Sequence, residues 1–411
     1  VVEHLLDKPT AGELTFFKGV HRLRAGHFLN ASADGVAQRA YWEPRGERVE
    51  LATEEDHVAR FRELFRQAIA SRVDAEEAVG AQLSGGLDSS SVTAMAAEIY
   101  REDGPSLPEM STLSETYSGF PCDESPYIEV MTGWLPFDAQ QVDCSTFDLP
   151  LSIEDELWKE DGPTAELVPD RTLRTSQALS SFGARVLLTG YGGDELTWDP
   201  EWAPDLLRKG QFVSAYQQAW RLSRLPEESA LPAILRRAVV HSIPNGLRRW
   251  LVAIRPRAAE PWPDHVKTGL DRYLGGGEEP PMPRAEFPSI AQQTVYRWLS
   301  DPLLHWNLER LEQRYASRGR ELRHPFFDRR LAELVLAIPF DKRVGPPGLP
   351  KALLRQAMQG LLLTEILERR TQAVFDTYFL AAWERWRPYL REVIHSSDPW
   401  LSEPYTDPKR V

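Results

Sequence analysis

Two short loops carry residue types that could act on a polyphosphate. The first is Ser-Gly-Gly-Leu-Asp-Ser at 84–89, where two glycines allow the backbone to approach a ligand closely. Backbone amides and the hydroxyls of Ser84, Ser89 and Ser90 could donate to phosphate oxygens. Asp88 would repel a phosphate unless a cation lay between them, so the loop predicts Mg²⁺ as well as a nucleotide. Because the sequence is not GxxxxGK[ST], an enzyme that transfers the γ-phosphate is disfavoured. The alternative to a nucleotide-binding loop is an ordinary glycine-rich turn between a strand and a helix.

The second loop, Gly-Tyr-Gly-Gly-Asp-Glu at 190–195, supplies another carboxylate. Both loops directly follow an apolar stretch that reads as a β-strand. The carboxyl ends of parallel strands meet at one edge of a sheet, so we expect Asp88 and Asp194 to face one crevice. Two carboxylates there could hold Mg²⁺ against a leaving pyrophosphate. Alone, this second pattern is more typical of a solvated turn, but beside the first loop it indicates chemistry.

The surrounding segments predict an α/β fold with a parallel sheet. Apolar strands are expected at 78–83, 110–114 and 185–189, alternating with helices. One helix is expected to begin at Thr53, whose hydroxyl can accept from an amide of the first turn. From about residue 200 the pattern is mostly helical, with a loop at 275–281.

The N-terminal residues read differently, as short strands at 14–17, 27–30 and 40–44 separated by glycines. This is too little sequence for an independent domain. We interpret residues 1–50 as the end of a β-rich domain. The chain begins at Val1 rather than Met, so we expect that upstream sequence is missing.

Composition excludes several classes of protein. The net charge of −13 argues against nucleic-acid binding and against an anionic membrane surface. Two cysteines in 411 residues indicate neither a disulfide framework nor a zinc site. No apolar run is long enough for a membrane span, and no signal peptide is visible. We therefore expect a cytoplasmic protein.

The two loops, together with segments at 319–328 and 351–371, resemble the synthetase domain of the asparagine synthetase superfamily. The four motifs occur in the family's order. The resemblance implies a PP-loop fold of adenine nucleotide alpha-hydrolase-like type with a large helical portion over 51–411, and a glutaminase-like remnant over 1–50. It also implies ATP and Mg²⁺ as ligands and adenylation of a carboxylate. The predicted ATP-binding residues are Leu83, Ser84, Gly85, Gly86, Asp88, Ser89, Ser90, Ser114, Gly190 and Gly192, and the predicted metal ligands are Asp88 and Asp194.

Three features favour a lactam-forming member of this superfamily. No cysteine precedes Cys122, so no glutaminase nucleophile is visible. β-Lactam synthetases carry a tyrosine at the place of Tyr191 and pair it with a glutamate that matches Glu321. Residues 351–371 look most like lasso peptide cyclases, which join a peptide's N-terminal amine to an Asp or Glu side chain. That subtype implies a precursor peptide substrate, a leader-peptide recognition protein and a leader protease.

Three other functions remain open: an asparagine synthetase that uses glutamine or ammonia, a non-catalytic scaffold of a biosynthetic complex, and a tRNA-modifying or sulfur-transferring relative. The acidic charge and the lack of catalytic cysteines disfavour the last of these.

The resemblance also suggests roles in catalysis. Tyr191, held by Glu321, is the predicted base, although it could instead pack near the adenine or ribose, and Glu321 could pair with Arg323 or Arg320. Lys351 is predicted to stabilise phosphate or the oxyanion. Relatives have a lysine near the place of Gln372, which can donate hydrogen bonds but carries no charge. The residues predicted to line a substrate cavity are Trp198, Trp202 and Gln372.

Overall fold

The structure is a computed structural model. It describes residues 15, 17–33, 35–44, 53–73, 77–104, 107–147, 158, 169–198, 202–223, 231–243, 287, 289–339, 342–343 and 349–394. The predicted loop at 275–281 lies outside these residues, as do Leu14 and Phe16 of the first predicted strand.

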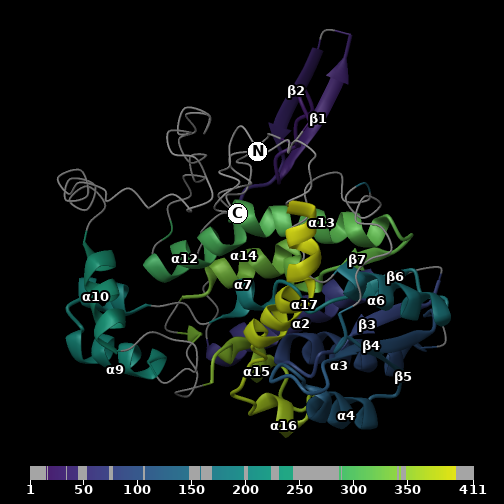
Figure 1. Cartoon of the computed structure of the whole chain (residues 1–411). Coiled ribbons are helices and arrows are strands. Elements are labelled where there is room, and N and C mark those ends of the chain that lie inside the picture. The colour runs from purple at the N-terminus through teal and green to yellow at the C-terminus, as the bar shows by residue number, and fades with distance from the viewer. Residues whose placement is uncertain are drawn as a thin grey trace.

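A five-stranded sheet lies at the centre of the fold, and Figure 1 shows the strands of this sheet grouped on one side of the molecule. The strand order is β5-β4-β3-β6-β7, and every neighbouring pair is parallel, which confirms the predicted α/β class. Three strands were expected from their apolar runs, whereas the outer strands β5 and β7 were not. β5 is polar and mostly exposed, and β7 has only three residues, so neither gives an apolar signal. The bounds are β3 Val79–Gln82, β4 Met110–Thr116, β5 Asp138–Asp143, β6 Val186–Leu188 and β7 Glu321–Arg323.

Helices surround the sheet and make up most of the C-terminal half, as the sequence predicts. The helix expected after Thr53 is α2, and its capping interaction is present: the Asp56 amide donates to Thr53 Oγ1 at 3.1 Å. The described helices are α2 Glu54–Val73, α3 Leu87–Asp103, α4 Ser125–Trp134, α6 Pro169–Ser181, α7 Gly193–Thr197, α8 Ala203–Arg208, α9 Phe212–Leu222, α10 Leu231–Ser242, α12 Ile290–Leu299, α13 Pro302–Ala316, η3 Pro325–Phe327, α14 Arg329–Ala337, α15 Ala352–Ala357, α16 Thr364–Leu367 and α17 Asp376–Ile394. None of them is long and apolar enough to cross a membrane.

The main core joins α2, α3, α14 and α15 to the sheet. Its centre is aromatic, because the rings of Phe65 and Phe326 are fully buried with centroids 4.9 Å apart. A second cluster, which includes Leu179 of α6 and Leu187 of β6, packs beside Gly80 of β3. A Cβ at Gly80 would lie 2.5 Å from Leu179 Cδ2. The sheet is therefore tightly packed below the ends of its strands, where the two loops lie.

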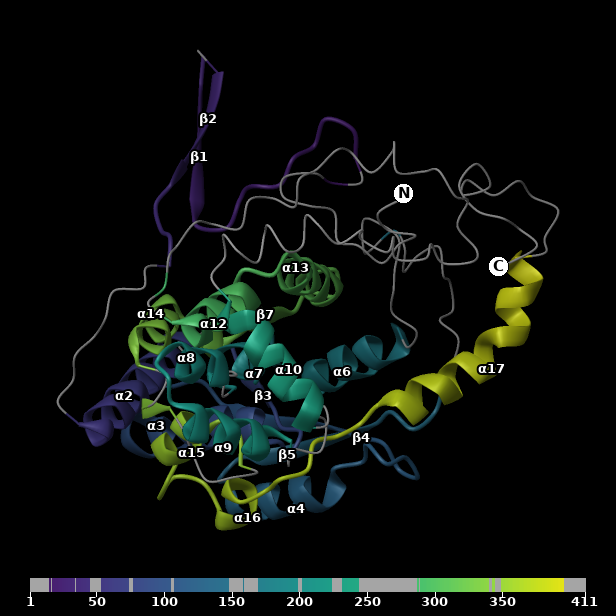
Figure 2. The same cartoon turned by 90° about the vertical axis from the view of Figure 1, so that its left-hand side faces the viewer.

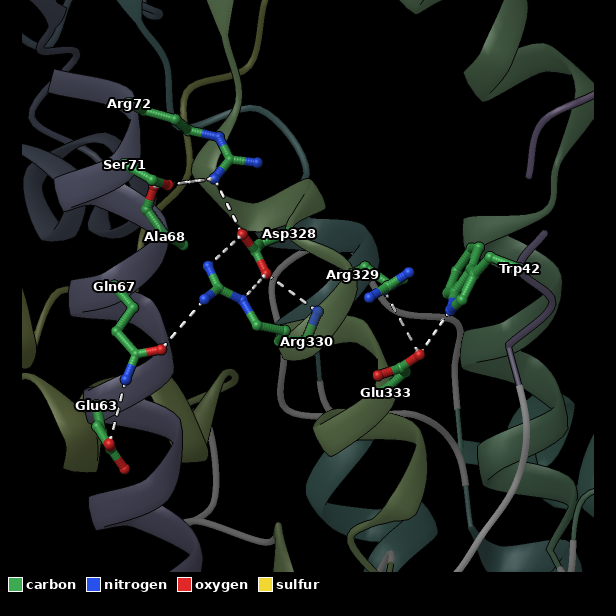
Figure 3. Close-up of polar contacts among 10 residues, drawn as sticks. All are labelled: Trp42, Glu63, Gln67, Ala68, Ser71, Arg72, Asp328, Arg329, Arg330 and Glu333. Carbon is green, nitrogen blue, oxygen red and sulfur yellow. Dashed lines mark hydrogen bonds and ion pairs between the residues drawn. The ribbon is translucent and has the colours of Figure 1, made fainter. Parts of the chain in front are cut away.

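The N-terminal residues form a hairpin of β1 His27–Ser32 and β2 Gly35–Ala40, which projects from the molecule in Figures 1 and 2. The strand predicted at 27–30 is confirmed within β1, but the strand predicted at 40–44 is wrong. Its residues instead close the open end of the hairpin: the amides of Tyr41 and Trp42 donate to the Gly26 carbonyl at 2.8 and 3.1 Å. The Trp42 indole donates to Glu333 of α14 at 2.6 Å (Figure 3), which attaches the hairpin to the body.

A polar cluster fixes the third motif segment against α2 (Figure 3). Asp328 caps α14 by accepting from the Arg330 amide at 3.0 Å, and it also accepts from Arg72 of α2 at 3.0 Å. Burial alone would raise the pKa of Asp328, but the hydrogen bonds from Arg330 and Arg72 lower it to about 2. The Arg323 guanidinium donates to the Arg72 carbonyl at 2.8 Å. These contacts hold β7 and the segment after it in a fixed position beside β6.

Candidate active site

The first loop lies between β3 and α3 and is held by its own serines. Ser84 Oγ and Ser89 Oγ share a hydrogen bond of 2.9 Å, and the Ser84 amide donates to Ser89 Oγ at 3.1 Å. Gly85 has φ +78°, and a Cβ there would lie 2.7 Å from Tyr127 Cβ of α4. Glycine is therefore required at this position for both conformation and space.

The glycines of the second loop allow it to touch the first. A Cβ at Gly190 would lie 2.6 Å from the Ser89 amide nitrogen, and one at Gly193 would lie 2.4 Å from Asp88 Cγ. Real Cβ atoms do not approach other atoms so closely. The sequence expectation that the two loops face one crevice is thus borne out by direct contact between their backbones and side chains.

Lys351 lies between the two carboxylates. Its Nζ is 2.5 Å from Asp88 Oδ2 and 2.7 Å from Asp194 Oδ1, and the residue is only 5% exposed. It precedes α15 with φ 65°, a left-handed conformation that is uncommon for residues other than glycine. A lysine that precedes a helix usually faces solvent, but this one is buried. The structure instead places its charge at the junction of both loops.

Burial and charge shift the ionisation of this cluster. Burial alone would lower the pKa of Lys351, but the charges of Asp88 and Asp194 outweigh it and raise that pKa. Lys351 is therefore an ammonium at neutral pH. Burial raises the pKa of Asp88, and Lys351 opposes that rise. Removing the ammonium would leave Asp88 as a buried and uncompensated charge.

The cluster also fits a magnesium ion shared with phosphate. Asp88 Oδ1 is buried and has no hydrogen-bond partner among the described residues, while Asp194 lies on the other side of Lys351 with a side chain 63% exposed. The described residues contain no group of three or more His, Cys, Asp or Glu side chains that could hold a metal. Two carboxylates that share an ion with phosphate oxygens match the usual coordination of Mg²⁺.

Two arginines of the segment 351–371, the fourth of the family motifs, fix another part of the site. Arg369 donates to the Gly85 carbonyl at 3.0 Å, pairs with Glu124 at 2.5 Å and stacks 3.9 Å above the Tyr127 ring. Arg355 donates to the carbonyls of residues 350, 367 and 369 at 2.6, 2.5 and 3.0 Å. Arg369 therefore locks this segment onto the first loop, whereas Arg355 ties the two ends of the segment to each other.

These elements enclose a cavity of about 210 Å³, which we call the nucleotide cavity. Its wall carries four cationic side chains, so it suits a polyphosphate. The lining residues are Gly86, Leu87, Asp88, Glu124, Asp194, Pro350, Lys351, Arg355, Arg369, Arg370, Thr371, Gln372 and Ala373.

The predicted ATP-binding residues divide into three groups. Gly86 and Asp88 line the nucleotide cavity, whereas Ser84, Gly85, Ser89, Gly190 and Gly192 shape the two loops. Leu83, Ser90 and Ser114 are at most 1% exposed and do not line it. The hydroxyls of Ser90 and Ser114 are buried without a partner among the described residues.

The predicted pairing of Tyr191 with Glu321 is not formed among the described residues. Glu321 accepts from Arg323 Nε at 2.7 Å, which matches the structural alternative. The reason is register: Glu321 lies opposite Val186 at the start of β6, whereas Tyr191 follows the end of that strand. The Tyr191 ring instead lies 5.8 Å from that of His324, between centroids.

The ionisation of Tyr191 also speaks against a base of the predicted kind. Burial raises the pKa of Tyr191, the charge of Glu195 adds to that rise, and a hydrogen bond from Asn307 opposes it. A phenol with a raised pKa keeps its proton at neutral pH. Burial likewise raises the pKa of the Glu195 carboxyl, and the charges of Asp194 and Asp88 add to the effect.

A second cavity of about 330 Å³ lies next to the first, between α7 and α13, and shares Asp194 with it. We call it the α7–α13 cavity. Trp198 lines it as predicted, whereas Trp202 packs with α8 and Gln372 lines the nucleotide cavity. The lining residues are Tyr191, Asp194, Glu195, Trp198, Trp298, Asp301, Leu303, Leu304 and Asn307.

Sequence reasoning missed several residues of these walls. The two arginines at 369–370 belong to the segment 351–371 and could have been predicted from their charge. Asn307 lies on α13, far from any motif, so only the arrangement of α7, α12 and α13 around the cavity reveals it.

Comparisons with known proteins identify relatives of this chain. Residues 60–411 match the family model described as asparagine synthase. Amidase chyE of Penicillium rubens is 28% identical over 232 residues, which are 54% of this chain and 34% of that protein. Glutamine-hydrolyzing asparagine synthetase 3 of Bacillus subtilis is 26% identical over 375 residues, which are 86% of this chain and 54% of that protein. The chain thus spans about half the length of the Bacillus relative and a third of the Penicillium one.

Proposed function

The chain belongs to the asparagine synthase family, and on that premise we propose that it is an ATP-dependent amide-forming ligase that adenylates a carboxylate. The observation that carries the proposal is the Lys351 ammonium held between Asp88 and Asp194 inside a cavity with three further cations. This arrangement suits a triphosphate whose leaving group must be neutralised.

In the first step, an oxygen of the substrate carboxylate attacks the α-phosphorus of ATP. The bond from that phosphorus to the oxygen bridging to the β-phosphorus breaks, and pyrophosphate leaves with the electron pair. Lys351 and Arg370 are placed to interact with its negative charge, while Arg369 and Arg355 keep the wall rigid. Asp88 and Asp194 would hold Mg²⁺, which when bound would supply positive charge to the phosphates.

In the second step, an amine attacks the acyl carbon, loses a proton and expels AMP. We assign the proton to Glu195 rather than Tyr191. Burial raises the pKa of the Glu195 carboxyl, which makes its carboxylate a stronger base, whereas the Tyr191 phenol keeps its own proton. Tyr191 then serves as a wall of the acceptor site, where Asn307 orients its hydroxyl.

For the substrate, we propose a ribosomal precursor peptide whose N-terminal amine closes onto an Asp or Glu side chain, as in lasso peptide cyclases. The size and aromatic wall of the α7–α13 cavity favour this over ammonia, which needs no such cavity. A leader-peptide recognition protein and a leader protease would be partners of that reaction. Amidation of aspartate is the second candidate, because relatives named asparagine synthetase match the chain.

Mass spectrometry of the products distinguishes these candidates. The enzyme would be incubated with ATP, Mg²⁺ and either the leader-free precursor peptide or aspartate with ammonium. Loss of one water from the peptide, with AMP formed, supports the macrolactam proposal. Asparagine as the sole product supports the second candidate, whereas no product from either would support a non-catalytic scaffold.

A further inference from the structure

The α7–α13 cavity differs in charge from the nucleotide cavity beside it. The described residues that line it include Asp194, Glu195 and Asp301 but no Lys or Arg. The nucleotide cavity has Lys351 and three arginines in its wall. Since the two share Asp194, a cavity with a cationic wall adjoins a cavity with anionic and aromatic walls.

The aromatic walls suit a cation as well as apolar surface. Tyr191, Trp198 and Trp298 come from three different segments and line the same space. The ring of Trp198 already faces a cation on the nucleotide side, because Lys351 Nζ lies 5.9 Å from its centroid. Aromatic faces attract ammonium groups within about 6 Å, and more strongly when water is excluded.

The polar groups of the cavity differ in the contacts that they already make. Asp194 is already paired with Lys351, and Asp301 accepts from the Leu303 amide at 2.8 Å as the cap of α13. Glu195 lines the same wall and supplies its third carboxylate. Asn307 donates to Tyr191 and fixes the hydroxyl at the same wall.

We propose that the α7–α13 cavity is a binding site for a primary ammonium group that has an apolar or aromatic group beside it. The ammonium lies among the carboxylates and Asn307, and the carbon chain packs against Trp198, Trp298 and Leu303. The proposal rests on the proposed function in one respect: this ammonium is the acceptor amine before it loses its proton. It narrows the acceptor from the N-terminal amine of any peptide to that of a peptide whose first residue has an apolar or aromatic side chain.

The test measures binding alone, with three probes of similar shape and different charge: 2-phenylethylammonium, 2-phenylethanol and 3-phenylpropionate. Ligand-observed NMR titration at neutral pH gives a dissociation constant for each, with the whole chain and without ATP. One cation–π contact and the nearby carboxylates predict that the ammonium binds about tenfold more tightly than the carboxylate probe.

Paired variants of Leu303 locate the effect. Leu303 is 41% exposed and lines the cavity, so both Leu303→Lys and Leu303→Gln are expected to fold. Leu303→Lys adds a cation and should reduce the preference for the ammonium at least about fivefold, or by about 1 kcal/mol. Leu303→Gln has a similar length without charge and should keep the preference. Asn307→Lys adds a cation at a second exposed position of the wall and should likewise reduce the preference for the ammonium.

Equal affinity for all three probes would overturn the proposal. So would an ammonium preference that survives both lysine variants, since the probe would then bind elsewhere. Because no nucleotide or peptide is present, these results are separate from the proposed function. Adenylation could be confirmed while the ammonium site fails, or the reverse.

Discussion

Replacing Gly193 by alanine tests the contact between the two loops. The added Cβ would lie 2.4 Å from Asp88 Cγ, 2.6 Å from Oδ1 and 2.7 Å from Asp88 Cβ. Ordinary contact between such atoms needs about 3.4 Å or more, so the loops must separate by about 1 Å. The near side chain is not a free end, because Asp88 Oδ2 is held by Lys351.

The cost follows from that displacement. Overpacking a well-packed site typically costs about 1–3 kcal/mol, so the free energy of unfolding should fall by that amount. A shift of about 1 Å in catalytic carboxylates can reduce a rate about 100-fold. We expect the affinity for Mg²⁺ with α,β-methylene-ATP to fall by about tenfold, because both carboxylates would leave their positions around Lys351.

Urea unfolding and calorimetric titration of that ATP analogue would measure both effects. Gly133→Ala in α4 is the matched control, since a Cβ there meets nothing within 4 Å. It should be neutral or stabilise the helix by up to about 1 kcal/mol. Wild-type stability and affinity in Gly193→Ala would refute the close contact, as would equal losses in both variants.

Three further changes test other parts of the site. Lys351→Met should lower the free energy of unfolding, measured in urea, by about 2–3 kcal/mol, which is less than for a fully buried ion pair because Asp194 is exposed. Added Mg²⁺ should restore part of this loss. An unchanged free energy of unfolding would contradict the ion-pair cluster. Burial lowers the pKa of His324 from 6.5 to about 4, so the unfolded chain binds more protons between these values and stability falls as pH drops through that window, by about 3 kcal/mol at most. Urea unfolding at pH 7 and pH 5 should therefore differ less for His324→Gln than for the wild type, and an equal difference would exclude His324 as the cause. Asp328→Asn should cost about 2 kcal/mol at pH 7, because its pKa of about 2 reflects bonds to Arg72 and Arg330 that are lost as pH falls from about 4 to 2; full stability in urea would contradict the role of this cluster.

The central sheet and the two loops could be predicted from the sequence because they depend on local patterns. Apolar runs before 84–89 and 190–195 identify β3 and β6, and parallel strands must bring their carboxyl ends together. The glycines indicate close approach, and the structure gives the reason at Gly190 and Gly193. Thr53 predicts the start of α2 because its capping bond spans only three residues.

The features that could not be predicted from the sequence depend on contacts between distant segments. The pairing of Glu321 with Arg323 rather than Tyr191 follows from the register of β7 against β6, which no local pattern encodes. Asn307 meets Tyr191 only because α13 packs near α7. The polar strand β5 lies at the sheet edge, where an apolar pattern is not required.

The most direct test of the proposed adenylation is exchange between labelled pyrophosphate and ATP in the presence of Mg²⁺. The wild-type chain would be offered the leader-free precursor peptide and, separately, aspartate, beside an Asp88→Asn variant. The account predicts exchange that requires one of these carboxylate substrates and that is lost in Asp88→Asn. Exchange that persists unchanged in Asp88→Asn would contradict the assigned site, and no exchange by the wild type with either substrate would contradict the adenylation itself.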